Sequence, residues 1–592
     1  MKTIANTFDI EQEAFTNASE RVMRQTLEAL LFEGILEARY EGTVCRFAGR
    51  TRHGDEVSYS CEAVKKASFG RVRIKLGSIR REGALCGDVF LLLEEVVQNQ
   101  LNGPLVHTFI RELLETLAKD QQSKACEPER IPTHDLHYEA LESHMRDGHR
   151  YHPAYKSRIG FSLADNLNYG PEFDQQVLLH WVAVDEQLID TELSRGRTAD
   201  EMYEMHLTTD DLLAFRRMTD NSGVPGTRYV YLPVHPWQME HVIPTVFAAQ
   251  LASREILHLG TSSHCSYRAQ QSIRTLSLRS TAAPYLKLAL SLVNTSTSRI
   301  LAQHTVRNAP RIADWLDGIL RSDSWFQQER FELLREWMGI SFRYDKLSPV
   351  PFKLAYGTLG TVVRENVAVH LKPEEEAWPL NAVFYTQRSG EPFIAKAIEQ
   401  HGLEAWSRAL IRTLVRPIIH LLYAHGIALE SHAQNIILVT ENGWPTRIIV
   451  KDLHDGVRYV PELLRNPEWE PELVPEPETH RAFNRYSFLR AESASEVRDY
   501  TLDAFFFICM TDICFALESL GLEEKQFWRL CEEAITDYQQ EHPQLADRYS
   551  LFDLFGEDAL IEEMTKRRIY GDGELFFRAA DNPLRAARGE KQ

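Results

Sequence analysis

The chain has 592 residues, of which 44% are hydrophobic and 26% are charged, as is ordinary for a soluble globular protein. Its 85 acidic and 66 basic side chains give a net formal charge of −19, which repels nucleic-acid phosphates and anionic lipid. We therefore expect no nucleic-acid or membrane partner, and the length predicts three or four structural units.

The first region, residues 1–146, opens with a predicted amphipathic helix over Ser19–Leu36. A second helix is predicted over Val89–Leu117, and the polar segment Asp120–Pro132 is predicted to be a linker or exposed loop. Between the helices lie short β-like stretches separated by turns that contain glycine, at Thr43–Phe47, Val57–Cys61 and Val72–Ile74.

The second region, residues 147–348, contains predicted strands at Tyr229–Val234 and Leu286–Val293. The third region, residues 349–592, contains a long apolar-patterned helix at Leu403–His425, then a hairpin and further helices. Strands and long helices are mixed without a regular repeat of βαβ units, so the predicted fold class is α+β.

Eight cysteines are spread along the chain without a CxxC pair, which is typical of reduced cytosolic thiols. The first residues lack the apolar core and cleavage site of a signal peptide. The apolar run Ala504–Leu517 is short and interrupted by Asp512, so no membrane span is predicted. We expect a cytoplasmic protein.

The most informative segment is a predicted β-hairpin, because Asn442-Gly443 separates two apolar arms of similar length. Pairing of the arms brings His432 and Asn435, at the start of the first, close to Asp452 after the second. Carboxylate and amide oxygens suit Mg²⁺, and an imidazole can donate to phosphate, so we expect a Mg²⁺–phosphate site. The alternative is a polar hairpin mouth in which Asp452 caps the next turn.

A second group of side chains combines fixed positive charge with hydroxyl donors, which is what an anionic substrate requires. The alternative is a β-rich region with exposed basic residues. The group consists of Ser272, Arg274, Thr275, Lys287, Thr295 and Arg299.

The segment 147–161 is rich in His, Lys and Arg and suits a polycarboxylate. Its two histidines lie three residues apart, but no Cys or third His stands at a ligand spacing, so we expect no dedicated zinc site. The chain has no GxxxxGK[ST] phosphate loop, no GxSxG elbow and no GxGxxG fingerprint. If the protein binds ATP, it therefore does so without the common P-loop or Rossmann nucleotide-binding motif.

Several of these motifs, in this order, resemble the IucA/IucC family of NRPS-independent siderophore synthetases over nearly the whole chain. They are HPWQ at 235–238, SxRT at 272–275, Lys287, the pair Thr295 and Arg299, and HxxN…D at 432, 435 and 452. The resemblance implies a cupped-hand fold with a thumb (1–146), fingers (147–348) and a palm (349–592) that distantly resembles protein kinases, often in a homodimer. Lys451 departs from the family, many members of which carry Arg before the Asp.

The resemblance also implies roles for individual residues. ATP contacts fall on Ser272, Arg274, Thr275, Lys287, Arg299, His432, Asn435 and Asp452. Citrate contacts fall on His152, Lys156, Arg158, Thr295, Arg299, Glu430, His432 and Gln434. Catalytic roles fall on Arg274, Lys287, Arg299, His432 and Asp452, with Mg²⁺ held by Asp452 and Asn435.

The implied activity is an ATP- and Mg²⁺-dependent condensation of citrate, or a citrate mono-amide, with an amine through an acyl-adenylate. Within the family the chain most resembles the second citrate–amine ligases of petrobactin assembly, which implies spermidine or its catechol conjugate as the amine. Three alternatives remain: a family member with another amine or hydroxamate, a small-molecule kinase, and a catalytically silent regulator that binds ATP or citrate.

Overall fold

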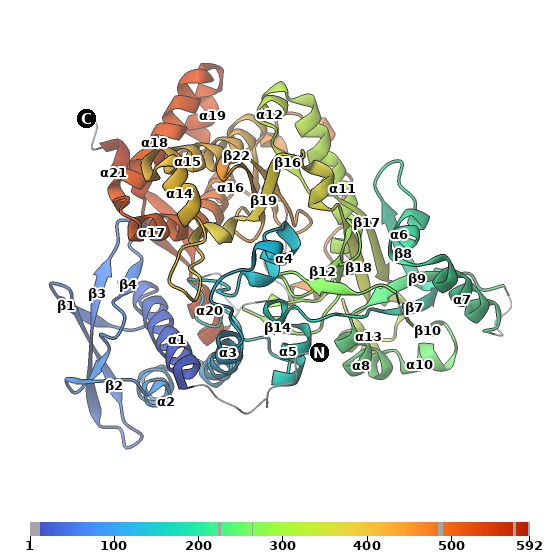
Figure 1. Cartoon of the computed structure of the whole chain (residues 1–592), viewed down its shortest axis with the longest axis horizontal. Helices are drawn as coiled ribbons and strands as arrows, with labels where there is room; N and C mark the ends of the chain where they lie inside the picture. The colour runs from blue at the N-terminus through green and yellow to red at the C-terminus, as the bar shows by residue number, and fades with distance from the viewer. Residues whose placement is uncertain are drawn as a thin grey trace.

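The computed structural model describes residues 12–222, 226–262, 264–295, 297–482, 489–571 and 576–589. Helices and strands alternate irregularly and nearly all strand pairs are antiparallel, which confirms the predicted α+β class. Figure 1 shows the N-terminal sheet (blue) at one end, the middle sheets (green) at the other, and the C-terminal helices (orange to red) above the N-terminal sheet.

The N-terminal region is an antiparallel sheet packed on the long helix α1 (Gln12–Phe32). Its central strands β2 (Val44–Arg50) and β3 (Glu56–Lys65) alternate between buried and exposed residues, so one face of the sheet supplies the core. The other strands are β1 (Ala38–Glu41), β4 (Val72–Ile74), β5 (Arg80–Arg81) and β6 (Ala84–Leu85).

The predicted single helix Val89–Leu117 is wrong. The segment forms α2 (Val89–Leu92) with a π turn η1 (Leu93–Gln98), and a second helix, α3, spans Val106–Ala125. A Cβ on Gly103, in the break, would lie 2.3 Å from the Ile569 side chain, so the chain needs glycine where α20 (Met564–Tyr570) approaches. The predicted exposed loop from Asp120 is also wrong at its start, because α3 continues and Asp120 is buried.

The middle of the chain forms two sheets. The larger has the order β11-β12-β13-β18-β17-β8, and the smaller has the order β10-β7-β9. The long helix α11 (Gln303–Ser322) packs so closely on β17 that a Cβ on Gly339 would meet the Val306 carbonyl oxygen at 2.1 Å. The strands are β7 (His180–Asp185), β8 (Ile189–Leu193), β9 (Tyr229–Val234), β10 (Ile256–Thr261), β11 (Tyr267–Ala269), β12 (Thr275–Leu278), β13 (Tyr285–Leu288), β17 (Glu336–Phe342) and β18 (Gly360–Arg364).

The predicted strand Tyr229–Val234 is confirmed as β9, whereas the predicted strand Leu286–Val293 is too long. β13 ends at Leu288, and Val293 belongs to a separate short strand, β14 (Val293–Asn294). The division predicted after residue 348 lies between β17 and β18, which are neighbours in one sheet.

The C-terminal region contains a sheet in the order β16-β22-β21-β19, with helices against it. The predicted helix Leu403–His425 is confirmed as α15 (Leu403–His420), which continues into the π turn η8 (Leu421–His425). The predicted hairpin is confirmed as β21 (Ile436–Glu441) and β22 (Trp444–Val450). The outer strands are β16 (Glu332–Leu333) and β19 (Glu375–Pro379).

The first and last parts of the chain share one hydrophobic core. The Phe32 ring at the end of α1 stacks on Phe507 in the π helix η12 (Leu502–Met510), with centroids 5.4 Å apart. The Glu33 carboxylate accepts the backbone N–H groups of Thr565 and Lys566, at 3.0 and 2.7 Å, at the start of α20. The ends of the sequence therefore stabilise each other.

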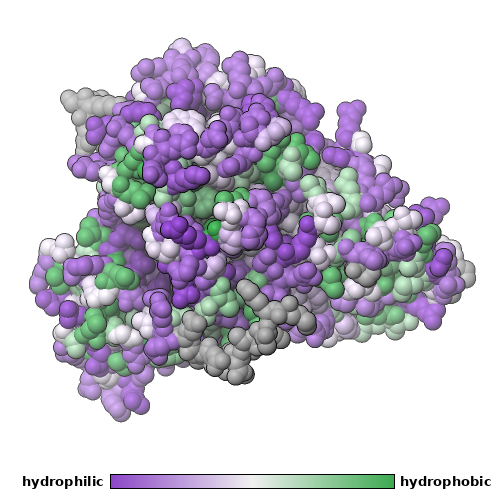
Figure 2. Space-filling view, in the orientation of Figure 1, coloured by the Kyte–Doolittle hydropathy of each residue, from purple (hydrophilic) through white to green (hydrophobic). Residues whose placement is uncertain are grey.

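One helical stretch, Ala494–Ser519, is long and apolar enough to cross a membrane by length and composition. Its most apolar window is 72% buried inside the protein, as expected for a core helix. On the face shown in Figure 2, hydrophilic residues predominate and hydrophobic ones form small separate groups.

Candidate functional site

The end of the β21–β22 hairpin brings two predicted site residues together. Asn442 and Gly443 both have positive φ, 52° and 75°, as a tight hairpin turn requires. At the other end of the hairpin, the Lys451 N–H donates to the Asn435 carbonyl at 2.9 Å, and Asp452 follows directly. The predicted convergence of Asn435 and Asp452 is confirmed.

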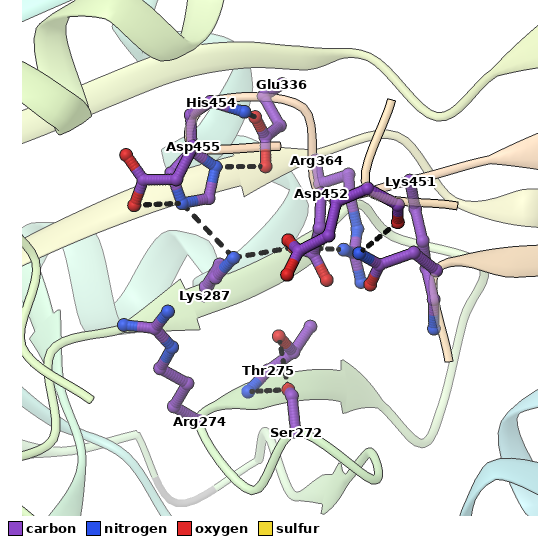
Figure 3. Close-up of polar contacts among 12 residues, drawn as sticks. Ser272, Arg274, Thr275, Lys287, Glu336, Arg364, Lys451, Asp452, His454 and Asp455 are labelled. Carbon is purple, nitrogen blue, oxygen red and sulfur yellow. Dashed lines mark hydrogen bonds and ion pairs between the residues drawn. The ribbon is translucent and has the colours of Figure 1, made fainter. Parts of the chain in front are cut away.

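Asp452 lies against two cations from the neighbouring sheet (Figure 3). Its Oδ1 accepts from Lys287 Nζ on β13 at 2.6 Å and from Arg364 at the end of β18 at 3.0 Å. Burial would raise the pKa of Asp452, but the charges of Lys287 and Arg364 outweigh it and hold the pKa well below its ordinary value. Asp452 is therefore ionised, and among the described residues no donor contacts its Oδ2.

A buried carboxylate fixes the imidazole next to Lys287. Glu336 on β17 accepts from His454 twice, at 2.8 Å from the ring Nδ1 and at 3.1 Å from the backbone N–H. Because a carboxylate only accepts, Nδ1 carries a proton. Nε2 lies 3.3 Å from Lys287 Nζ, and because an ammonium group only donates, this nitrogen accepts and helps to hold the ammonium group.

The SxRT segment forms a tight loop before β12. The Ser272 hydroxyl donates to Thr275 Oγ1 at 2.8 Å and accepts the Thr275 N–H at 3.2 Å. Arg274 NH1 donates to the carbonyls of Arg299 and Ile300 at 3.0 and 2.8 Å. This leaves Nε and NH2 of Arg274 without a partner in the described part of the chain, and available to an anion.

Arg299 is short of acceptors. Its NH2 has two long contacts, 3.3 Å to the Asn294 carbonyl and 3.4 Å to Thr295 Oγ1, and its buried Nε has no partner among the described residues. Burial, with the neighbouring charge of Arg274, lowers the pKa of Arg299 to about 10, so the group stays charged at neutral pH. A buried guanidinium with unused donors is well suited to a carboxylate or phosphate.

Three loops that meet at the site carry backbone strain. Ile273, Thr295 and Asp452 have φ values of 69°, 58° and 62°, in the left-handed region. Two of the three are β-branched, and such residues rarely adopt this conformation. Strained positions of this kind concentrate at functional sites, where the surrounding structure holds them in place.

The residues 430–434 line the same hairpin end. His432 Nε2 lies 3.8 Å from Glu430 Oε1, and both side chains, like Gln434, are partly exposed. A Cβ on Gly456 would meet the Asp452 carbonyl oxygen at 2.7 Å and Glu430 Cβ at 3.1 Å, so the turn after Asp452 needs glycine. The predicted grouping of His432 with this hairpin end is confirmed, and its contacts to substrates stay predictions.

The segment 147–161 divides into two kinds of residue. His152 is fully buried, and its Nδ1 accepts the Ala154 N–H at 3.1 Å, so Nε2 carries a proton with no acceptor among the described residues. Lys156 lies 3.0 Å from Asp120, and Arg158 pairs with both oxygens of Glu172 at 3.0 and 2.9 Å. The predicted carboxylate contact of His152 stays a prediction. Buried carboxylates already neutralise Lys156 and Arg158, so these two have no free charge for the predicted contact.

Glu336, Arg364 and His454 are absent from the predicted site. His454 follows Asp452 by two residues, so its position was a usable signal. Glu336 and Arg364 face each other on paired strands, and nothing in the motif spacing marks either of them.

Asp452 and Asn435 fit the hard oxygen ligands that Mg²⁺ prefers. Asn435 Nδ2 donates to the Glu430 carbonyl at 3.0 Å, and its Oδ1, like Oδ2 of Asp452, accepts no hydrogen bond from the described residues. Glu336 belongs to the same cluster of ligand-type atoms, but His454 uses both of its oxygens. Two protein oxygens, with phosphate and water oxygens, would complete a Mg²⁺ shell.

Comparison with known proteins identifies the family. Residues 137–385 match the IucA / IucC family, and residues 404–575 match a family described as ferric iron reductase FhuF-like transporter. A Staphylococcus aureus protein, 2-[(L-alanin-3-ylcarbamoyl)methyl]-3-(2-aminoethylcarbamoyl)-2-hydroxypropanoate synthase, is 39% identical over 97% of this chain and 94% of its own. The chain belongs to the IucA/IucC family.

A second family member, the citryl-spermidine/3,4-dihydroxybenzoyl-citryl-spermidine:spermidine ligase of Bacillus anthracis, is 32% identical over 98% of this chain and 95% of its own. The crystal structure of the petrobactin biosynthesis protein AsbB from Bacillus anthracis superposes with a TM-score of 0.90 at 32% identity, covering 98% of this chain and 97% of that one. Aerobactin synthetase IucC from Klebsiella pneumoniae, at 24% identity, shares the fold with a TM-score of 0.80, over 97% of this chain and 99% of that one. The predicted family and fold are confirmed.

Proposed function

We propose that this IucA/IucC family member joins a free carboxylate of a citrate mono-amide to a primary amine of a small polyamine, with cleavage of ATP to AMP and pyrophosphate. The observation that supports this best is a pair of guanidinium groups with unused donors. Arg299 has an unpartnered buried Nε, and Arg274 uses only NH1. Both lie near the ionised Asp452 and its partner Lys287. Such a site can bind two anions together, a carboxylate and a nucleoside triphosphate.

The reaction would have two steps. A carboxylate oxygen attacks the α-phosphorus of ATP, and pyrophosphate leaves. The amine nitrogen then attacks the acyl carbon, loses a proton, and AMP leaves. Arg274, Lys287 and Arg299 would stabilise the charge on phosphate and carboxylate, and His152 Nε2–H would donate to the acid.

Further residues would hold the nucleotide. Asp452 and Asn435 would hold the Mg²⁺ that accompanies ATP, and the ion would add positive charge beside the phosphates. Thr275 and His432 would donate to phosphate oxygens, and Ser272 would do so when its hydroxyl turns away from Thr275. Thr295, Glu430 and Gln434 are proposed to line the acid side of the site.

The relatives support the substrate class. The name of the Staphylococcus aureus protein describes a 2-hydroxypropanoate that carries two carbamoyl arms, one of them 2-aminoethyl. The name of the Bacillus anthracis ligase pairs citryl-spermidine with spermidine. We therefore propose a mono-amide as the acid and spermidine as the amine, with a short diamine as the competing amine.

A nucleotide-product assay on the full chain tests the reaction type. With acid, amine, ATP and Mg²⁺ present, we expect AMP, pyrophosphate and an amide of the corresponding mass. The hairpin end would also serve γ-phosphoryl transfer, so ADP with a phosphorylated substrate would identify a small-molecule kinase instead. ATP binding without any product would indicate a regulator.

A competition assay tests the substrates. Free citrate and citryl-spermidine are offered at equal concentration, each with spermidine or ethylenediamine, and the products are separated by mass spectrometry. A preference for free citrate would overturn the mono-amide proposal, and a preference for ethylenediamine would overturn the spermidine proposal. Neither result would affect the ligase proposal.

We also retain as proposals a division into thumb (1–146), fingers (147–348) and palm (349–592), a homodimer, and a location in the cytoplasm. Size-exclusion chromatography with light scattering on the full chain tests the homodimer.

A further inference from the structure

A second cluster of ionisable side chains lies where α12 (Ser324–Glu329) packs against the end of α15. Asp323 Oδ2 lies 3.3 Å from His420 Nε2 and 3.0 Å from His425 Nε2. Both histidines are buried, and the Asp323 side chain is 9% exposed. None of these residues contacts the candidate active site, and Figure 1 shows α12 and α15 at the top of the molecule, away from β12.

The π turn η8 explains why two histidines five residues apart reach one carboxylate. In a regular α-helix such residues lie about 140° apart around the axis and face different directions. The wider π turn over Leu421–His425 brings His420 and His425 to the same side. Single π turns inside helices frequently occur at functional sites.

The two imidazole rings are held in place by their neighbours. Trp325 stacks on His420 with centroids 4.1 Å apart, and Phe326 stacks on His425 at 5.7 Å. The Nδ1 of His420 lies 2.7 Å from the Tyr538 hydroxyl, which orients its Nε2 toward Asp323. Metal-binding histidines are oriented in this way by a hydrogen bond to the other ring nitrogen.

We propose that Asp323, His420 and His425 form a binding site for a divalent transition-metal cation of the zinc class. In a tetrahedral site, bonds of about 2.0–2.1 Å place neighbouring ligand atoms roughly 3.3–3.4 Å apart. The two nitrogen–oxygen separations, 3.3 and 3.0 Å, need only small adjustments to reach this spacing. Two imidazoles and a carboxylate form a ligand set that zinc accepts.

Arg465 supplies positive charge at the same place in the absence of metal. Its NH1 lies 3.0 Å from Asp323 Oδ2, and its side chain is 55% exposed, so it can withdraw into solvent. His542, whose buried Nε2 has no partner among the described residues, has its ring centroid 6.0 Å from that of His420. His542 is not part of the three-residue cluster of ligand atoms, so the fourth metal position would fall to water.

Metal titration of the full chain tests this site. The protein is dialysed against a chelator and titrated with Zn²⁺, and separately with Co²⁺, whose visible bands report tetrahedral coordination. We expect one equivalent to bind, a rise in the melting temperature with Zn²⁺, and a loss of at least about 100-fold in affinity in His425→Gln, because loss of an outer-shell partner alone costs 10–100-fold. Arg465→Gln should bind several-fold more tightly.

His258→Gln is the matched control, because His180 and His258 form a cross-strand pair with nitrogens 2.9 Å apart and His258 is exposed. This variant should bind metal like the parent.

The proposal is overturned if the parent protein binds no Zn²⁺ and shows no tetrahedral Co²⁺ bands, or if binding is lost in His258→Gln and kept in His425→Gln. Should His425→Gln fail to fold, the parent spectrum and Arg465→Gln decide the question. None of these outcomes bears on the ligase reaction.

Discussion

Asp452 neutralises two cations that are themselves almost fully buried, Lys287 and Arg364. Asp452→Asn would leave both without their counter-charge, so we expect the free energy of unfolding to fall by up to about 3–5 kcal/mol. Pyrophosphate release should fall by orders of magnitude, because the variant also loses the carboxylate that we propose as a Mg²⁺ ligand.

Urea unfolding and a pyrophosphate assay measure the two effects separately. Asp455→Asn is the matched control, because this neighbouring carboxylate is 36% exposed and lies 3.8 Å from His454. A folded Asp452→Asn protein with near-normal turnover would remove Asp452 from the metal site.

Arg299 is suited to two-pronged recognition of an anion. We expect Arg299→Lys to lose nearly as much activity as Arg299→Ala, because an ammonium group cannot reproduce the planar guanidinium fork. Initial rates over a range of acid and ATP concentrations measure the effect. If the Lys variant kept most of its activity and its apparent affinities, Arg299 would act as a diffuse charge.

Glu336→Gln changes hydrogen-bond polarity without changing shape. The Gln oxygen can accept the backbone N–H of His454, but the Gln NH₂ group then faces the ring Nδ1 and must donate to it. The ring proton therefore moves to Nε2, where it faces the Lys287 ammonium group. We expect ATP–pyrophosphate exchange to fall at least tenfold while the melting temperature changes little.

A double-variant cycle identifies the cause of that loss. If Glu336 acts through the His454 ring, Glu336→Gln should add little further loss in a His454→Ala background. Independent, additive losses would contradict the tautomer argument.

At the scale of elements, His370 joins two strands. It lies at the end of the short helix η6 (Val367–His370), with Nδ1 3.2 Å from Glu332 on β16 and Nε2 3.2 Å from Glu365 after β18. Burial would lower the pKa of His370, but the two carboxylates outweigh it and raise the pKa to about 9. The imidazolium therefore holds these segments together at neutral pH.

Because the folded pKa exceeds the unfolded value of about 6.5, this stabilisation is complete below pH 6.5 and is lost as the pH rises through about 9. The shift corresponds to roughly 3 kcal/mol. We expect the difference in unfolding free energy between the parent and His370→Gln to shrink by about that amount from pH 6 to pH 10. A difference that stays constant with pH would contradict this assignment.

The sequence correctly predicted those elements whose defining residues lie within one short stretch of the chain. Asn442-Gly443 between apolar arms was sufficient for the hairpin, and the hairpin then placed Asn435 near Asp452. The break near Gly103 was missed because its cause is Ile569, far along the chain. Glu336 was missed for the same reason, because only strand pairing brings it beside residues of other segments.

At the scale of the whole molecule, the charge of −19 should attract a cationic amine over long distances. Salt screens such attraction, with a Debye length of about 10 Å at 0.1 M. We expect the KM for spermidine to rise several-fold between 50 and 500 mM NaCl, whereas screening of the same negative charge should not raise the KM for the anionic acid. A mono-amine is the control and should respond weakly, and equal responses of both amines would show that the surface charge plays no part.

The core shared by the two ends of the chain has a consequence during synthesis. The apolar end of α1, with Phe32, leaves the ribosome long before Phe507 and the α20 backbone that cover it. At about 5–20 residues per second, that wait lasts roughly half a minute to a minute and a half. Throughout it the nascent N-terminal region carries an uncovered hydrophobic face, so its productive folding depends on protection from aggregation until translation is nearly finished.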